Sequence, residues 1–231
     1  MSSPAQDPRP TITSAAAQAA RDAALGRFQA KFVVTKENVI GQFKNTGVRV
    51  YEFEHGLVRQ KSGESPQVFR WDRIAQVYQG NAAEYLNGVY TGTRFGYAIV
   101  RDDGLSMSIS GTYLDPRLAR NADPNSTSSK YEALGRSIVL KVSNIQLPRA
   151  LETLNNGGSL TFGDMTISVA GVQAARYGVV PWSEITEVKV EKGRIRISRA
   201  NMFLALSNRP IGKIPNFPLS ITLAEALRRQ R

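Results

Sequence analysis

The chain has 231 residues, enough for one or two domains with ordinary hydrophobic cores. It contains no cysteine, which excludes disulfides, cysteine-ligated metals and thiol chemistry. No apolar run approaches the roughly 20 residues of a membrane-spanning helix, and the first residues lack the apolar core of a signal peptide. We therefore expect a cytoplasmic protein, either free or peripheral on the inner face of the membrane.

The positive charge is concentrated towards the C-terminus. The formal net charge is +11, and residues 157–231 carry 11 basic and 5 acidic residues, a balance of +6. Such a field favours anionic partners, namely lipid headgroups, nucleic acid or acidic protein surfaces. The alternative is a basic surface without a specific partner.

The N-terminal part is expected to be helical. Residues 1–12 are Pro-rich and polar, which is typical of disorder. Within residues 13–46, an Ala-rich pattern predicts a helix from Ser14 to about Phe32, followed by a lead-in to the first domain. Thr13 or Ser14 can supply its N-cap.

From Val48 onward, the apolar residues mostly alternate, as in β-strands. In a first domain, residues 47–156, we predict strands near 48–54, 56–61, 67–71, 74–79, 94–101, 105–110 and 137–143. Between them we predict a polar loop at 80–93, a hairpin turn at Asp102–Gly104, a long exposed loop at 115–130 and a short helix at 147–154.

A second domain, residues 157–231, follows a junction at Asn155–Gly158. Its predicted strands lie near 159–163, 165–170, 173–181, 185–191, 194–199 and 202–207. Thr222 and Glu225 have the spacing of a capping box, which predicts a final helix that starts there. Antiparallel strands that end on a helix define an α+β unit.

The two domains share the pattern Trp-x-x-Ile-x-x-Val, which occurs at Trp71–Val77 and, 111 residues later, at Trp182–Val188. In each case it follows a strand, a Gly turn and a second strand, so the chain contains a duplicated unit. Repetition at a core position favours packing of both tryptophans over ligand stacking.

A family resemblance rests on four segments: Tyr51–Val58, Phe69–Val77, Val180–Val190 with the following Gly193, and Ile214–Phe217. They are similar to pleckstrin-homology-like (PH-like) domains of the GRAM and bacterial branches, and to an uncharacterised bacterial family of this type. The resemblance covers roughly residues 47–231. It implies two tandem antiparallel β-barrels, each closed by a C-terminal helix. It also implies non-catalytic binding of phosphoinositides, other anionic lipids, peptides or partner domains.

In lipid-binding PH-like domains, basic residues beside the first hairpin hold phosphates. The resemblance places a secondary basic patch there, formed by Arg59, Lys61 and Arg70.

The densest charge lies in Lys189–Arg199. If Lys192-Gly193 forms a two-residue turn, Lys189 lies opposite Arg196, and alternation places Val188, Val190, Ile195 and Ile197 on the core face. The opposite face then offers an anion- or lipid-binding patch of Lys189, Lys192, Arg194, Arg196 and Arg199. The alternative is a solvated face whose charges block edge aggregation.

Catalysis finds little support in the sequence. His55 is the only histidine, and no cysteine can act as a nucleophile. We expect no enzyme, no cofactor, no metal site and no small-molecule substrate. The favoured function is a binding or scaffold module that recognises a protein partner, a second copy of itself or an anionic membrane. The alternative is a nucleic-acid-binding accessory protein.

Overall fold

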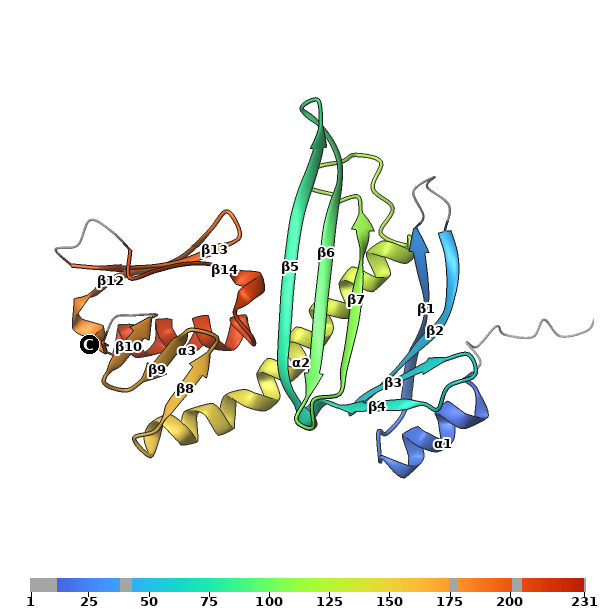
Figure 1. Ribbon diagram of the computed structural model, residues 1–231, viewed down its shortest axis with the longest axis horizontal. Coiled ribbons are helices and arrows are strands. Elements are labelled where there is room, and N and C mark those ends of the chain that lie inside the picture. Colours follow the sequence, from blue (N-terminus) through green and yellow to red (C-terminus); the bar gives the residue numbers. More distant parts are fainter. Residues whose placement is uncertain (1–11, 38–42, 175–177, 201–204, 231) are drawn as a thin grey trace, which may run out of the picture. The chain divides into compact units, whose positions relative to one another are not determined.

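The computed structural model describes residues 12–37, 43–174, 178–200 and 205–230. The chain divides into two compact units, Met1–Arg73 and Ile74–Arg231. Along the sequence, one plan occurs twice: a four-stranded antiparallel sheet, a 3-10 turn, a three-stranded antiparallel sheet and a helix (Figure 1). We call the two occurrences the first repeat (β1 to α2) and the second repeat (β8 to α3). The domain boundary expected after residue 156 stays a prediction.

The first unit consists of one helix on one sheet. Its elements are α1 (Ser14–Asp22), β1 (Phe28–Glu37), β2 (Phe43–Phe53), β3 (Gly56–Lys61), β4 (Gln67–Arg70) and the 3-10 turn η1 (Trp71–Arg73). Thr13 is the N-cap of α1, as predicted, since its side-chain oxygen accepts a hydrogen bond from Ala16 N. The predicted extension to Phe32 is wrong. Ala24 and Gly26 have positive φ angles that end the helix, and Phe32 pairs with Val50 in the sheet.

The second unit begins with the rest of the first repeat. It contains β5 (Ile74–Leu86), β6 (Val89–Arg101), β7 (Ser106–Tyr113) and α2 (Thr127–Asn155). One face of this sheet is buried under α2, where Tyr97 OH donates to Glu132 Oε1 at 3.3 Å. An added Cβ atom at Gly135 would lie 2.1 Å from the Tyr97 ring, so the ring rests directly on the helix backbone.

Two predictions for this region are wrong. The segment 137–143 lies inside α2, because Ile138, Val139 and Val142 are buried there at helical spacing. The segment 80–93 forms a hairpin in place of a polar loop, since Asn87 and Gly88 adopt φ angles of 49° and 80° and make a two-residue turn.

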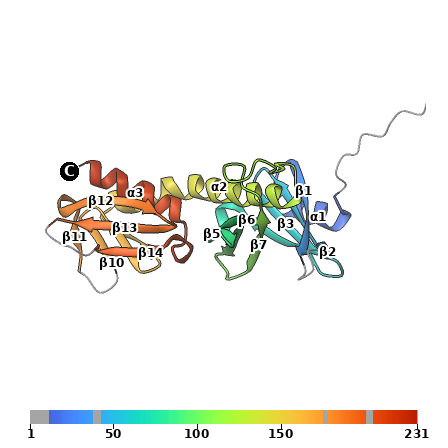
Figure 2. The same ribbon diagram turned by 90° about the horizontal axis from the view of Figure 1, so that it is seen from above.

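The second repeat repeats the plan with shorter strands. Its elements are β8 (Ser159–Phe162), β9 (Met165–Ser168), β10 (Gly171–Ala174), β11 (Val180–Pro181), η2 (Trp182–Glu184), β12 (Ile185–Glu191), β13 (Arg194–Arg199), β14 (Ser207–Pro210), η3 (Ile211–Lys213) and α3 (Phe217–Arg229). Residues from both sheets, from α3 and from the end of α2 form one buried cluster. In Figure 2, α2 runs from the β5–β7 sheet to these sheets.

The final helix starts before the predicted capping box. Thr222 lies inside α3, where its hydroxyl donates to Pro218 O. The N-cap is Asn216, which has a φ of 50°. Its side chain accepts from Val77 N and donates to Ala75 O, both at 2.8 Å, and its own N–H donates to Val77 O at 2.9 Å. Asn216 therefore ties the start of α3 to β5.

Each repeat has the same tryptophan corner, which we define as the Trp, the Gly that pairs with the residue before it (Gly56 or Gly171) and the carbonyl that binds the indole. Trp71 Nε1 donates to Glu54 O at 2.9 Å, and Trp182 Nε1 donates to Ser168 O at 2.8 Å. Both rings are buried, at 3% and 2% exposure. The prediction that these residues pack in the core is confirmed.

The resemblance implies β-barrels that a helix closes at one end, but no closed barrel is seen in the described residues. Their strands form four separate open sheets, of orders β1-β2-β3-β4, β5-β6-β7, β11-β10-β9-β8 and β12-β13-β14. The 3-10 turn at each tryptophan interrupts the ladder, since its residues leave the extended conformation that strand pairing needs. The architecture is α+β with antiparallel sheets.

Candidate functional site

The β12–β13 hairpin has the predicted turn and register. Lys192 and Gly193 adopt φ angles of 49° and 70°, and the positive φ explains the glycine. Lys189 pairs directly with Arg196 across the two strands. The cross-strand geometry of the proposed anion-binding patch was therefore predicted correctly.

The core face of this hairpin is smaller than predicted. Ile195 and Ile197 are fully buried, whereas Val188 is half-buried and Val190 is 47% exposed. The buried cluster of the second repeat extends only as far as Val188, so Val190 lies beyond it beside the turn. The placement of Val190 in the core was wrong.

Several basic side chains of the hairpin already have local partners. Lys189 Nζ lies 3.5 Å from Glu191 Oε2, and Arg199 pairs with Glu184 at 2.7 Å. The Arg194 guanidinium donates to the side chain and the backbone oxygen of Asn208. These contacts orient the cations without removing their charge.

The outer face of β12 and β13 also carries acidic side chains. Glu187 and Glu191 alternate with Lys189 on β12, and all three are exposed. Residues 184–199 together hold five basic and three acidic residues. The structure therefore brings the predicted basic residues together on one hairpin, but with a net charge of only +2 there.

The three residues of the secondary basic patch bind partners within the first unit. Arg59 Nη1 donates to Gln67 Oε1 at 2.8 Å, and Lys61 Nζ lies 2.5 Å from Glu64 Oε1. Arg70 binds both Asp72 and the backbone oxygen of Ala23. The hydrogen bond from Lys61 lowers the pKa of Glu64 below its usual value, so this carboxylate stays charged beside the lysine. An incoming phosphate would have to compete with these partners.

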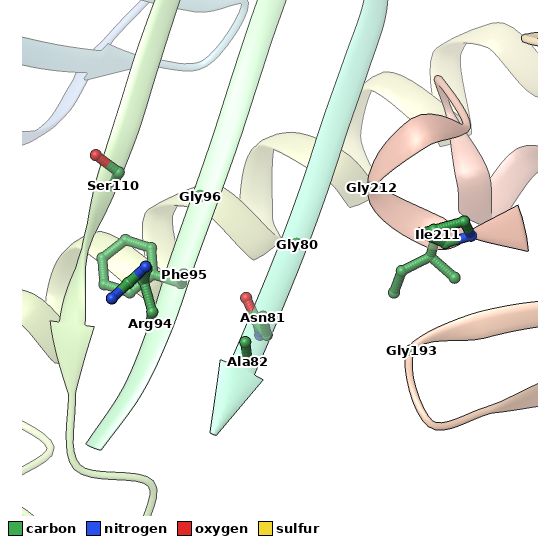
Figure 3. A pocket seen from close by; sticks show the side chains of 11 residues that line it. Gly80, Asn81, Ala82, Arg94, Phe95, Gly96, Ser110, Gly193, Ile211 and Gly212 are labelled. Carbon is green, nitrogen blue, oxygen red and sulfur yellow. The ribbon is translucent and has the colours of Figure 1, made fainter. Parts of the chain in front are cut away.

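A cavity that the sequence did not predict opens on the other face of the β5–β7 sheet. Its volume is about 490 Å³, and a neighbouring cavity of about 380 Å³ shares part of its lining. Gly80, Gly96 and Ser110 form a row of small residues across the three strands, and Ile211 and Gly212 line the opposite side (Figure 3). Because we predicted a loop at 80–93, we did not expect a sheet face there.

The cavity offers few chemical groups. Arg94, its charged lining residue, pairs with Glu84. Asn81 and Ser110 supply the other polar side chains. Small residues leave room for a ligand, but a stripe of small residues alone specifies none.

Acidic residues in two turns, Asp103 and Asp123, form local hydrogen bonds. Asp103 binds the Arg101 guanidinium and accepts from Leu105 N, which closes the β6–β7 turn and holds the pKa of Asp103 well below its usual value. Asp123 Oδ1 accepts from Asn125 N in a local turn. No group of three or more His, Asp or Glu side chains that would suit a metal ion occurs in the described part of the chain.

No helix among the described residues is long and apolar enough to cross a membrane. No curated protein and no solved structure matches the chain. Residues 32–231 match the model of one family, DUF6585, whose description is a family of unknown function. This match includes both tryptophan corners and nearly all of the sheet structure, so the chain belongs to the DUF6585 family.

Proposed function

We propose that this chain is a non-catalytic binding module of two PH-like repeats that attaches to anionic membrane surfaces through the β12–β13 hairpin. The repeated order of four strands, a tryptophan corner, three strands and a helix supports the PH-like assignment. The PH-like assignment concerns only the fold. The proposed membrane binding is argued from the residues of the β12–β13 hairpin.

The observation that carries this function is the exposed pair of like charges at Lys189 and Arg196. Two cations directly opposite each other repel, and a layer of phosphate groups relieves this repulsion. Lys192 and Arg194, which are also exposed, extend the pair to the turn. Each basic residue near an anionic surface contributes about 1 kcal/mol.

Vesicle co-sedimentation of the full chain tests the proposal. Vesicles that contain phosphatidylserine should bind the protein, and Lys192→Glu/Arg196→Glu should weaken this binding about 30-fold or more, since two attractive charges become repulsive. The control Lys130→Glu/Lys141→Glu makes the same change of net charge on α2 and should bind nearly as the parent does.

Equal binding by the two double variants contradicts the assignment of the hairpin. Absence of vesicle binding, together with a gel shift of single-stranded DNA that falls steeply with salt, supports the nucleic-acid alternative.

A further inference from the structure

The end of the β5–β6 hairpin is a two-stranded projection. β7 pairs with β6 only from Thr93 to Val100, whereas the β5–β6 ladder continues to Leu86 and Val89. Figure 1 shows the hairpin extending past the end of β7. We define the hairpin tip as residues 85–90.

The hairpin tip is apolar where hairpin turns are usually polar. Leu86 and Val89 are 67% and 66% exposed, the highest values among the large hydrophobic residues that the structure describes, and Tyr85 is 58% exposed. Single exposed hydrophobic residues are ordinary on protein surfaces. Three within five positions, at the end of a projection, form a patch whose exposure costs free energy unless something covers it.

The hairpin tip is held rigidly. The rings of Tyr85 and Tyr90 meet edge to face with their centroids 5.8 Å apart. The Tyr90 hydroxyl accepts from Asp115 N at 2.9 Å and lies 2.8 Å from Thr93 Oγ1. The Asn87-Gly88 turn adds a two-residue connection of fixed geometry. The apolar side chains are therefore presented in advance, which lowers the entropy cost of binding.

The hairpin tip has no charged side chain, and the charged residues next to it are paired. Glu84 and Arg94, the charged residues of segment 83–94, form an ion pair with each other below the tip. Leu86 and Val89 pair across the ladder, so their backbone groups are satisfied within the hairpin. Burial of the tip in an apolar medium therefore leaves no unpaired charge without water.

We propose that the hairpin tip inserts shallowly into a lipid bilayer, at the boundary between headgroups and acyl chains. A few side chains on a convex turn offer far less than the roughly 800 Å² per partner of a stable protein interface. A bilayer needs no complementary shape, and tyrosine suits its interface because it joins an apolar ring to a polar hydroxyl. This inference rests on membrane attachment, the proposed function, and adds an apolar contact to the basic one.

Tryptophan fluorescence in the full chain tests the insertion. The natural Trp71 and Trp182 are buried and give a constant background. The variant Leu86→Trp places a tryptophan at the tip, and the control Leu140→Trp places one on α2 at a site of 60% exposure. With vesicles of phosphatidylcholine and phosphatidylserine, emission of Leu86→Trp should shift to shorter wavelength and be quenched by lipids brominated on the acyl chains. Leu140→Trp should show neither change.

Binding measurements complete the test. Leu86→Glu/Val89→Glu should weaken vesicle binding at least about 10-fold, since two apolar side chains lose their burial. Leu140→Glu should leave it unchanged. Both sites are exposed, so these variants test binding without disturbing a core.

The outcomes separate the two proposals. Vesicle binding that depends on Lys192 and Arg196 but leaves Leu86→Trp unquenched overturns insertion and keeps the basic hairpin. Quenching of Leu86→Trp that persists in Lys192→Glu/Arg196→Glu supports insertion and overturns the hairpin assignment. Absence of binding to any vesicle overturns both.

Discussion

After the tryptophan corner of the first repeat, β5 and β6 run for 13 residues each, whereas β12 and β13 of the second repeat run for seven and six. The corners themselves are nearly the same, with indole hydrogen bonds of 2.9 and 2.8 Å to a carbonyl before the Gly turn. The part of the plan that is kept is therefore the part that fills the core.

The hairpins differ in chemistry as well as in length. The β5–β6 hairpin ends in Leu86, Asn87, Gly88 and Val89, and the β12–β13 hairpin ends in Glu191, Lys192, Gly193 and Arg194. One is apolar and the other is charged, on the same kind of two-residue turn. This contrast teaches that function in a duplicated fold is best sought where the copies differ, because shared positions mainly serve packing.

The largest expected effect is a break of the corners at their glycines. An added Cβ atom would lie 2.1 Å from Val180 O at Gly171 and 2.5 Å from Phe69 O at Gly56. Each contact is to backbone, which cannot turn away, so Gly171→Ala and Gly56→Ala should each destabilise their repeat by about 3 kcal/mol, Gly171→Ala the more. Amide hydrogen exchange of β9 and β10, and of β2 and β3, measures the loss. Gly80→Ala, where an added Cβ meets nothing within 4 Å, is the control, and an equal loss there would refute the steric explanation.

The tryptophans should respond alike if the corners are equivalent. Trp71→Phe and Trp182→Phe each remove one buried N–H donor and part of a buried ring, and should cost about 2 to 3 kcal/mol. Hydrogen exchange of the strands that flank each corner measures the loss of stability of each repeat separately. A cost confined to one repeat would show that the two indoles have different roles.

Much of the second repeat could be predicted from its sequence because its signals are local. The turn at Lys192-Gly193 and the alternation around Ile195 and Ile197 determine the hairpin register, and the structure has that register. The prediction for Val190 was wrong because alternation indicates which residues share a face, but not how far the core extends beneath that face. That limit depends on α2 and α3, which lie far away in the sequence.

In the first repeat, distant contacts override local preference. The β-branched run around Ile138 and Val139 has strand propensity, yet burial of one helical face in α2 decides its structure. The hairpin tip carried a usable signal, since Asn87-Gly88 is the common sequence of a two-residue turn. Gly80 and Gly96 argued against strands on either side of this turn, because glycine is rare in strands unless a close approach or an open surface permits it.

The connections between the repeats' last sheets and helices offer a smaller contrast. Asn216 makes three hydrogen bonds to β5 at the start of α3, whereas Ser126 caps α2 through Ser129 N. Asn216→Ala should therefore cost about 2 kcal/mol, and Ser126→Ala about 1 kcal/mol. Hydrogen exchange at the first turn of each helix checks this order. Equal losses would mean that the hydrogen bonds of Asn216 to β5 add no stability beyond that of a helix cap.

The smallest expected effect concerns the loop between β7 and α2, which the second repeat replaces with η3. Hydrogen bonds from the Arg117 side chain and its backbone N–H lower the pKa of Asp115 below its usual value. A depressed carboxyl pKa stabilises the folded state above the unfolded pKa, and this contribution disappears as the pH falls through the folded value. Arg117 is 84% exposed, so solvent screens the pair and its contribution to stability should be small. The parent should thus unfold at slightly higher denaturant concentration than Asp115→Asn at neutral pH and lose this advantage as the pH falls through the depressed pKa of Asp115. An advantage that grows on acidification would mean that the charge of Asp115 does not hold the loop.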